Sequence, residues 1–212
     1  MLGTVMIRLY EYPPSSNCQK VRLVLAEKNL TYETALIDLR QKQQKSPDYL
    51  RINPYGLVPA MEDEGTVLYE STIINEYLEE RYPTPPLLPH HPAARARARL
   101  LEDFRDNHFY PALKPLMAET RRKEKNKWDW EAIRVEFKKV APFFQRLEEE
   151  LGRKEFLVGD YSIADIAFTP NLARLVELEL GLPENFPLIR VWIKRLMARP
   201  SYQSIAQYVK AV

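Results

Sequence analysis

A run of prolines near the middle of the chain is the strongest constraint on its fold. Residues 83–92 read Pro-Thr-Pro-Pro-Leu-Leu-Pro-His-His-Pro. Proline fixes one backbone dihedral and has no amide hydrogen, so this segment is held extended and cannot be helical. It therefore separates two parts of the 212-residue chain. His90 and His91 have no third ligand at metal-binding spacing, so we interpret them as exposed linker residues and expect no metal site.

The part before the linker mixes two hydrophobic periods. Alternation of apolar and polar residues predicts strands, whereas a repeat near 3.6 residues predicts helices. The resulting order is strand, helix, strand, short helix, β-hairpin and helix. The predicted strands cover 6–12, 31–39, 58–62 and 66–68, and the longer helices cover 17–29 and 70–81. A helix between the first two strands implies that these strands pair in parallel.

Every pattern after the linker is helical. The first helix is long, and Pro111 and Pro115 predict kinks in it. Gly152 and Gly181 predict the ends of the second and third helices. The predicted helices cover 93–121, 130–151, 162–180, 187–197 and 201–212. The sequence thus predicts an α/β domain at 6–83, a linker at 84–92 and an all-α helical-bundle domain at 93–212.

Charge and cysteine content limit the class of protein. The net charge of +2 gives no indication of a nucleic-acid or anionic-membrane partner. The basic stretch 121–127 includes Glu124, and we interpret it as a solvated loop between helices. A single cysteine, Cys18, cannot form an internal disulfide, which is typical of a reducing compartment. No segment resembles a signal peptide or has the roughly 18 apolar residues of a membrane span, so we expect a cytoplasmic protein.

Four short segments share an order and spacing with a known family. They are Pro14-Ser15-Ser16-Asn17-Cys18-Gln19-Lys20-Val21-Arg22, Asn53-Pro54-Tyr55-Gly56-Leu57-Val58-Pro59, Leu68-Tyr69-Glu70-Ser71-Thr72-Ile73-Ile74 followed by Tyr77-Leu78, and Gly159-Asp160-Tyr161-Ser162-Ile163-Ala164-Asp165. With the proline-rich linker, they resemble the cytosolic glutathione transferase superfamily, in its serine-type, bacterial-like form. The resemblance covers nearly the whole chain. It implies a thioredoxin-like domain that binds glutathione, a helical domain and a homodimer.

In this family the first segment activates the thiol of glutathione. An unperturbed thiol with a pKa of about 8.5 is mostly protonated at neutral pH, and both a helix N-terminus and a hydroxyl donor stabilise its thiolate. In serine-type members the activating hydroxyl lies six residues before the valine of this segment, which selects Ser15 here. The neighbouring Ser16 is the alternative, because hydroxyls at helix starts also serve as N-caps.

Cys18 does not occupy the position of the cysteine in cysteine-type members. That position is three residues earlier, at Ser15. The displacement favours conjugation over disulfide exchange. We interpret Cys18 as a small buried apolar residue.

The second and third segments resemble the rest of the glutathione site. Val58 and Pro59 match the family's cis-proline pair, in which the residue before the proline pairs its backbone with glutathione. Glu70 and Ser71 match the acidic and hydroxyl residues that hold the γ-glutamyl end at a helix start.

Leu57 departs from the family pattern. Many members have glutamine or lysine at this position, close to the ligand, and leucine cannot form the same hydrogen bond. The glycine carboxylate of glutathione would then depend on residues 41–45, with Lys42 or Lys45 as its ligand. We therefore expect weaker binding of glutathione.

The fourth segment has a structural interpretation. Ser162 and Asp165 have the spacing of a capping box, in which a hydroxyl and a carboxylate satisfy the first amide groups of a helix. In the family this box begins the core helix of the second domain.

The resemblance also implies a second substrate that is apolar and electrophilic, bound between the two domains. The candidate residues for this pocket are Tyr12, Pro13, His108, Phe109, Tyr110, Met117 and Phe168. An aromatic stripe at helical spacing is more often core than pocket, so the helical candidates also have a packing interpretation. The sequence does not name the electrophile.

Two other functions fit the same sequence. Isomerases of maleylacetoacetate type share the paired serines and a similar linker, but they have cysteine where this chain has Asn17. Relatives of the starvation-protein or elongation-factor type use the same architecture as non-catalytic protein-binding modules. Leu57 favours that second alternative, whereas Ser15 and Glu70 favour an enzyme.

Overall fold

The structure is a computed structural model that describes residues 7–120, 123–180 and 185–209. By their contacts the residues form two compact units. The first comprises Met1–Leu87 and Pro200–Tyr208, and the second comprises Leu88–Arg199 and Val209–Val212. The expectations that involve Met6, residues 121–122, Gly181 or residues 210–212 lie outside the described residues.

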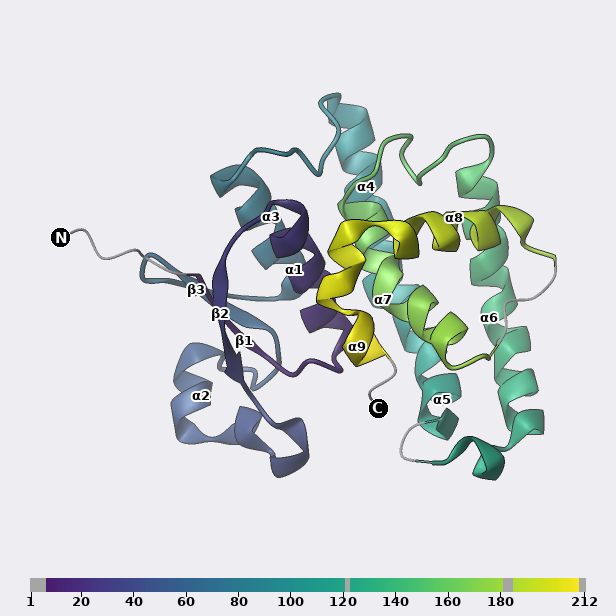
Figure 1. Cartoon of the computed structure of the whole chain (residues 1–212), viewed down its shortest axis with the longest axis horizontal. Helices are drawn as coiled ribbons and strands as arrows, with labels where there is room; N and C mark the ends of the chain where they lie inside the picture. Colours follow the sequence, from purple (N-terminus) through teal and green to yellow (C-terminus); the bar gives the residue numbers. More distant parts are fainter. Residues whose placement is uncertain (1–6, 121–122, 181–184, 210–212) are drawn as a thin grey trace. The chain divides into compact units, whose positions relative to one another are not determined.

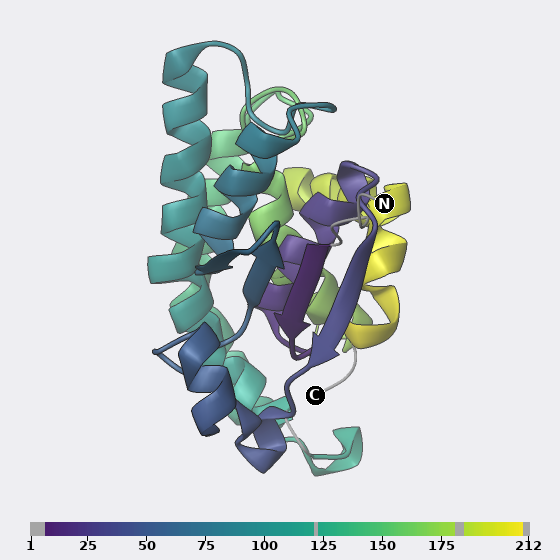
Figure 2. The same cartoon turned by 90° about the vertical axis from the view of Figure 1, so that its left-hand side faces the viewer.

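A mixed four-stranded sheet forms the base of the first unit. Its strands are β1 (Ile7–Glu11), β2 (Tyr32–Leu36), β3 (Ala60–Asp63) and β4 (Thr66–Tyr69). The order across the sheet is β2-β1-β3-β4, with β1 parallel to β2 and the other two pairs antiparallel. A parallel pair needs a crossover connection, which α1 (Ser16–Glu27) provides. In Figure 2 the strands of this sheet face the viewer.

Helices α1 and α3 (Ser71–Arg81) pack side by side on one face of this sheet (Figures 1 and 2). Lys20 contacts Thr72 near the start of both helices, at 3.0 Å, and Lys28 contacts Glu79 near their ends, at 2.7 Å. The two helices therefore run in the same direction. The apolar side chains between helices and sheet are fully buried, and they include Leu9, Val21, Leu25, Met61 and Ile74. The short elements η1 (Leu39–Gln41), η2 (Gln43–Lys45) and α2 (Pro47–Ile52) connect β2 to β3.

A buried lysine fixes the beginning of the linker to the first unit. The Lys28 ammonium donates to the carbonyls of Tyr82 (2.7 Å) and Pro85 (3.0 Å) and pairs with Glu79. Glu79 in turn accepts the amide of Leu87 with both carboxylate oxygens, each at 3.0 Å. Proline has no amide hydrogen, so a proline-rich segment offers few backbone donors to its own carbonyls. Lys28, the C-cap residue of α1, donates to two of these carbonyls instead.

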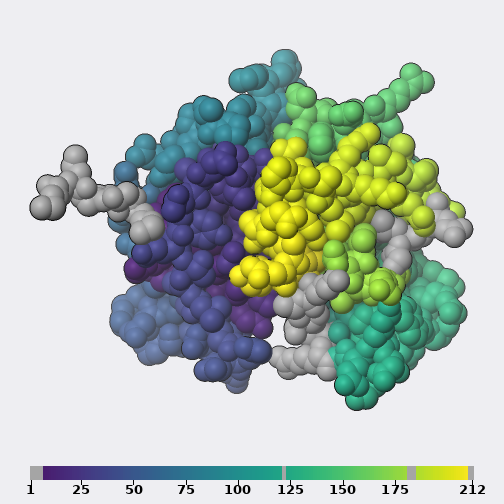
Figure 3. Space-filling view, viewed as in Figure 1, coloured from purple at the N-terminus to yellow at the C-terminus, as the bar shows by residue number. Residues whose placement is uncertain are grey.

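The end of the chain returns to the first unit. The sequence assigns residues 201–212 to the helical domain, whereas Pro200–Tyr208 belong to the first unit by their contacts. The reason is α1: Arg22 lies 4.8 Å from the ring of Tyr208 and 3.5 Å from the carbonyl of Ser204. This segment forms η5 (Pro200–Ser204) and the start of α9 (Ala206–Val209). In Figure 3 the yellow C-terminal residues lie against the purple N-terminal part of the chain.

The first helix of the second unit is interrupted by a π-helical turn. It consists of α4 (Pro92–Phe104), the π-helical η3 (Arg105–Phe109) and α5 (Tyr110–Thr120). The interruption precedes Pro111, which cannot donate to the carbonyl one turn earlier, and a wider turn relieves this loss. Arg105 is fully buried there and donates to Asn171 at 3.0 and 2.6 Å. The α-helix then continues to Thr120, with Pro115 inside it.

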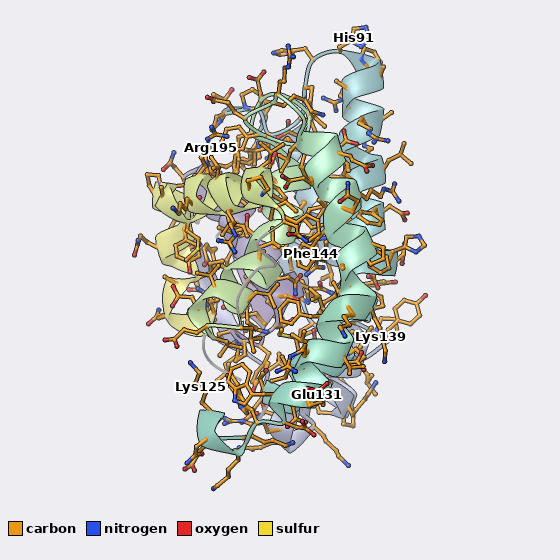
Figure 4. The ribbon with its side chains drawn as sticks, turned by 90° about the vertical axis from the view of Figure 1, so that its right-hand side faces the viewer. His91, Lys125, Glu131, Lys139, Phe144 and Arg195 are labelled. Atoms are coloured by element: carbon orange, nitrogen blue, oxygen red, sulfur yellow. The ribbon has the colours of Figure 1, made fainter. Side chains whose placement is uncertain are left out.

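Three further helices form the rest of the second unit. They are α6 (Trp130–Leu151), α7 (Ile163–Glu177) and α8 (Pro187–Ala198), close to the predicted ranges. Gly152 is the C-cap of α6, as predicted, with a positive φ of 52° that favours glycine. In Figure 4, Phe144 points from α6 toward the other helices, whereas Lys139 lies on the outer side of α6. Among the described residues, no helix is both long and apolar enough to cross a membrane.

The described lysines of the basic stretch 121–127 are paired with carboxylates. Lys123 pairs with Glu119, Lys125 with Glu179, and Lys127 with Glu124. This pairing fits a solvated loop better than an anion-binding patch.

The capping box predicted from the sequence is present at the start of α7. The Asp165 carboxylate accepts from the amides of Leu157 (3.1 Å) and Ser162 (3.0 Å), the Ser162 hydroxyl (3.2 Å) and the Trp192 indole (2.9 Å). Burial raises the pKa of Asp165 to about 6, while these hydrogen bonds act in the opposite direction. One carboxylate therefore joins α7, the loop before it and α8.

We expect Asp165→Ala to lower the free energy of unfolding by about 3–5 kcal/mol, because it leaves several buried donors without an acceptor. Ser162→Ala removes one cap and should cost about 1 kcal/mol. The exposed Asp160→Ala is the matched control, with an expected change below about 0.5 kcal/mol. Denaturant unfolding at neutral pH measures all three. Equal stability of Asp165→Ala and Asp160→Ala would contradict this role.

Candidate functional site

The turn before α1 and the loop before β3 meet at one end of the sheet. In the antiparallel pair β1–β3, Tyr10 lies opposite Ala60. Tyr12 comes two residues after Tyr10 and Val58 two residues before Ala60, so both lie at this end of the sheet. The first and second predicted segments are therefore neighbours within the first unit.

The start of α3 lies at the same end of the sheet. In the antiparallel pair β3–β4, Ala60 lies opposite Tyr69. Pro59 precedes Ala60 and Glu70 follows Tyr69, so both lie at this end of the sheet, and Ser71 begins α3 immediately afterwards. The turn before α1, the loop before β3 and the start of α3 are far apart in the sequence but lie at the same end of the sheet.

The first turn presents Ser15 at the start of α1. The Ser15 amide donates to the Tyr12 carbonyl at 2.8 Å, which closes a turn over Pro13 and Pro14. Ser15 is the N-cap of α1, yet its hydroxyl makes no capping hydrogen bond. Ser15 is half-buried, whereas Ser16 is 3% exposed. Of the two serines, Ser15 is the more exposed.

Cys18 lies one turn further along α1 and is completely buried. Burial raises the pKa of its thiol to about 12, although the Tyr12 backbone and the Ser15 side chain act in the opposite direction. A thiol with this pKa is protonated at neutral pH and is a poor nucleophile. The position and the environment of Cys18 both favour a packing role.

The loop before β3 contains Val58, which is half-buried and lies in a bend. The Val58–Pro59 peptide bond is cis. The Leu57 carbonyl accepts from the Tyr49 hydroxyl at 2.7 Å and the Asn53 amide at 2.8 Å, which fixes the loop from behind. The backbone hydrogen bonds of the described residues include none to the amide or carbonyl of Val58. An extended ligand backbone can pair there by strand addition.

Glu70 has an unusual backbone conformation. Its φ of 70° and ψ of 113° lie in a region that costs a non-glycine residue about 1–3 kcal/mol and that is enriched at functional sites. The Glu70 side chain is exposed and does not cap α3. A free carboxylate beside the first amides of α3 can bind the amine and the carboxylate of an amino-acid group together.

Lys42 and Lys45 are exposed in the segment before α2. The Lys45 ammonium donates to the Tyr55 carbonyl at 3.0 Å, which uses one of its three donors. Gly56 lies against this segment with φ +60°, and a Cβ there would be 2.6 Å from the Gln44 carbonyl. Lys45 is thus held close to the loop that leads to Leu57, and Leu57 is 56% exposed.

Two polar residues of this region were not predicted from the sequence. Arg40 forms a bidentate ion pair with Asp38 at 3.1 Å and lies close enough to Tyr12 for the two to interact electrostatically. Gln19 donates its side-chain amide to the Pro13 carbonyl at 2.8 Å. The sequence does not reveal either contact. The fold brings Arg40 close to Tyr12, and the Pro13 carbonyl that Gln19 contacts lies in an irregular turn.

The residues predicted for the electrophile pocket have different environments. Tyr12 and Pro13 are half-buried in the first unit. In the second unit, Phe109 and Phe168 are fully buried with ring centroids 5.3 Å apart, and Met117 is 7% exposed. His108 is exposed, with its ring 6.0 Å from that of Phe104, and Tyr110 is half-buried beside Arg105.

The described residues contain no cluster of three or more histidine, cysteine or acidic side chains suited to a metal ion.

Comparisons with known proteins give consistent matches. A model described as the glutathione S-transferase N-terminal domain matches residues 9–86, and one described as the C-terminal domain matches residues 105–200. A stringent starvation protein A homolog of Pasteurella multocida is 34% identical over 87% of this chain and 82% of its own length. Glutathione S-transferase 3 of Zea mays is 31% identical over 93% of this chain and 91% of its own. A theta class glutathione S-transferase of Xanthomonas axonopodis pv. citri, solved with glutathione bound, is 26% identical, with a TM-score of 0.86 and 99% coverage of both chains.

We expect Cys18 to resist modification in the folded protein, because its thiol is buried and protonated. At pH 8, Ellman's reagent should label it at least about 100-fold more slowly than a free thiol, and unfolding in guanidinium should restore one reactive thiol per chain. The unfolded chain is the internal control. Rapid labelling of the folded protein would show that Cys18 is accessible.

Proposed function

Because this chain belongs to the cytosolic glutathione transferase superfamily, we propose that it conjugates glutathione to small, apolar electrophiles. The observation that carries the proposal is the meeting of the Ser15 turn, the Val58 backbone and the strained Glu70 at one end of the sheet. In the reaction the thiolate forms a bond to an electrophilic carbon, and the leaving group departs with the bonding electrons. A role in detoxification follows from this chemistry.

Ser15 is the proposed catalytic residue. Its hydroxyl is not used as a helix cap, and it lies at the positive end of α1. A neutral hydroxyl that donates to sulfur stabilises the thiolate and has no equivalent interaction with the thiol. One pKa unit corresponds to about 1.4 kcal/mol, which is within the reach of a single charge-assisted hydrogen bond.

We assign the proposed ligands to the three parts of glutathione in turn. The Val58 backbone, set by the cis bond to Pro59, pairs with the cysteinyl residue. Glu70 and Ser71 hold the γ-glutamyl end at the start of α3. The glycine carboxylate is left to the exposed Lys42 or Lys45.

The electrophile would contact the remaining candidates. Tyr12 and Pro13 adjoin Ser15 in the first turn, and they are the candidates with the most direct support. The proposed helical contributors are His108, Phe109, Tyr110, Met117 and Phe168. Among these, the exposed His108 and the half-buried Tyr110 are the side chains most available to a substrate.

A homodimer is the proposed assembly. Strand β4 is an edge strand, and Val67 on it is 43% exposed. Tyr55 is 63% exposed and packs its ring against that of Tyr69, with centroids 5.6 Å apart. An exposed apolar strand edge is usually covered by a partner, and a second copy of the chain would serve. A cytoplasmic location is proposed because the single cysteine suits a reducing compartment.

A non-catalytic binding protein is the second candidate. Several similar curated proteins are named stringent starvation protein A homologs, a name that states no reaction. Leu57 is compatible with this candidate, since it removes a polar ligand from the site. Retention on immobilised glutathione, followed by assays with chlorodinitrobenzene, an isothiocyanate, a hydroperoxide and maleylacetone, separates the two. Absence of both retention and turnover would support the binding protein.

We expect Ser15→Ala to lower kcat/KM with the best of these electrophiles by about 10- to 100-fold, because one charge-assisted hydrogen bond to the thiolate is lost. Ser16→Ala and Cys18→Ala are matched controls and should remain within about threefold of wild type. Steady-state kinetics at several pH values measure the effect. Wild-type activity of Ser15→Ala would exclude this assignment, and loss of activity in Cys18→Ala would indicate disulfide chemistry.

We expect Leu57→Gln to tighten glutathione binding by about 5- to 10-fold, because one neutral hydrogen bond contributes about 1 kcal/mol. Leu57→Met has similar volume without the amide and should leave the dissociation constant unchanged. Calorimetric titration compares the three proteins. Equal affinities of the glutamine and methionine variants would show that Leu57 does not limit binding.

A further inference from the structure

Gln19 is a completely buried polar residue that lies directly behind the first turn. Its side-chain nitrogen donates to the Pro13 carbonyl at 2.8 Å. Its backbone amide donates to the Ser15 carbonyl at 2.9 Å, which is the first i→i−4 hydrogen bond of α1. The side chain of Gln19 therefore reaches back from the first turn of α1 to the Pro13 carbonyl.

The turn has few other means of fixing its shape. Pro13 and Pro14 have no amide hydrogens, so neither can donate a hydrogen bond. The Ser15 amide closes the turn onto Tyr12, and this bond leaves the Pro13 carbonyl without a backbone partner among the described residues. The Gln19 carboxamide satisfies that carbonyl.

Packing alone does not account for glutamine at this position. The other side-chain atom, Oε1, is buried and has no partner among the described residues. A buried acceptor without a partner costs about 1–3 kcal/mol, and an apolar side chain of the same length would avoid this cost. The hydrogen bond that offsets the cost goes to the turn that carries Ser15.

We propose that Gln19 is a positioning residue, which fixes the Ser15 turn and so sets how strongly the Ser15 hydroxyl stabilises a bound thiolate. The inference rests on the proposed function. It assigns part of the thiol activation to a side chain that does not touch the substrate. Loss of the Gln19 bond lets the turn relax, and the Ser15 hydroxyl then meets the sulfur at a poorer distance and angle. Hydrogen bonds weaken steeply with such misalignment.

The test uses Gln19→Met, which keeps the length of the side chain and removes the donor. The ultraviolet absorbance of the thiolate, titrated against pH, gives the apparent pKa of glutathione bound to each protein. We expect this pKa to rise by about one unit in Gln19→Met, a tenfold loss of thiolate near neutral pH. Gln19→His keeps an N–H donor and should remain within about half a unit of wild type.

Two controls separate positioning from general damage. S-methylglutathione has no thiol to ionise, so its dissociation constant should stay within about twofold of wild type in Gln19→Met. In a Ser15→Ala background, Gln19→Met should cause no further rise of the thiol pKa, because the effect passes through Ser15. A shift of equal size in both backgrounds, or a large loss of S-methylglutathione affinity, would overturn the proposal.

The outcomes also distinguish this inference from the function on which it rests. If wild type binds glutathione with a lowered thiol pKa and Gln19→Met gives the same value, the inference is wrong and the proposed function stands. If wild type shows no bound thiolate at any pH, the proposed function is wrong, and the role of Gln19 falls with it.

Discussion

A buried ion pair between Glu11 and Arg22 holds the first unit in the form that the site requires. Glu11 is the last residue of β1 and is completely buried, and Arg22 meets both of its carboxylate oxygens from the second turn of α1. The strand and the helix are thus tied on either side of the Ser15 turn. A bidentate pair of this kind fixes an angle as well as a distance. Removing one partner would leave the other as an unpaired buried charge, so the two residues depend on each other.

The loop before β3 and Glu70, at the same end of the sheet as this turn, are held in fixed conformations. The Leu57 carbonyl is held by Tyr49 and Asn53, and the Val58 backbone beyond it has no backbone partner among the described residues. Glu70 keeps an unfavourable conformation with an exposed carboxylate. A site held in place by the sheet can bind a peptide-like ligand with little reorganisation of its own, which lowers the entropic cost of binding.

Local features were predictable from the sequence, whereas contacts between distant segments were not. Gly152 and the Ser162–Asp165 box act within a few residues of their own positions, so their residue types sufficed. The cis bond before Pro59 was expected only through the family resemblance. The sequence predicted a kink at Pro111 and no π-helical turn. The structure has a π-helical turn at Arg105–Phe109, because proline marks the lost hydrogen bond and the wider turn forms upstream of it. The Glu11–Arg22 pair and the Gln19 bond depend on tertiary geometry, which no periodicity records.

The return of the last residues to the first unit has a consequence for biosynthesis. Arg22 is 8% exposed, and the ring of Tyr208 and the carbonyl of Ser204 are among the groups around it. These partners are synthesised about 180 residues after Arg22 itself. The amino-terminal half therefore emerges early, but α1 acquires these neighbours only after residues 204–208 have been synthesised. A fragment cut after the proline run would carry α1 with that side uncovered, which makes the isolated half prone to self-association.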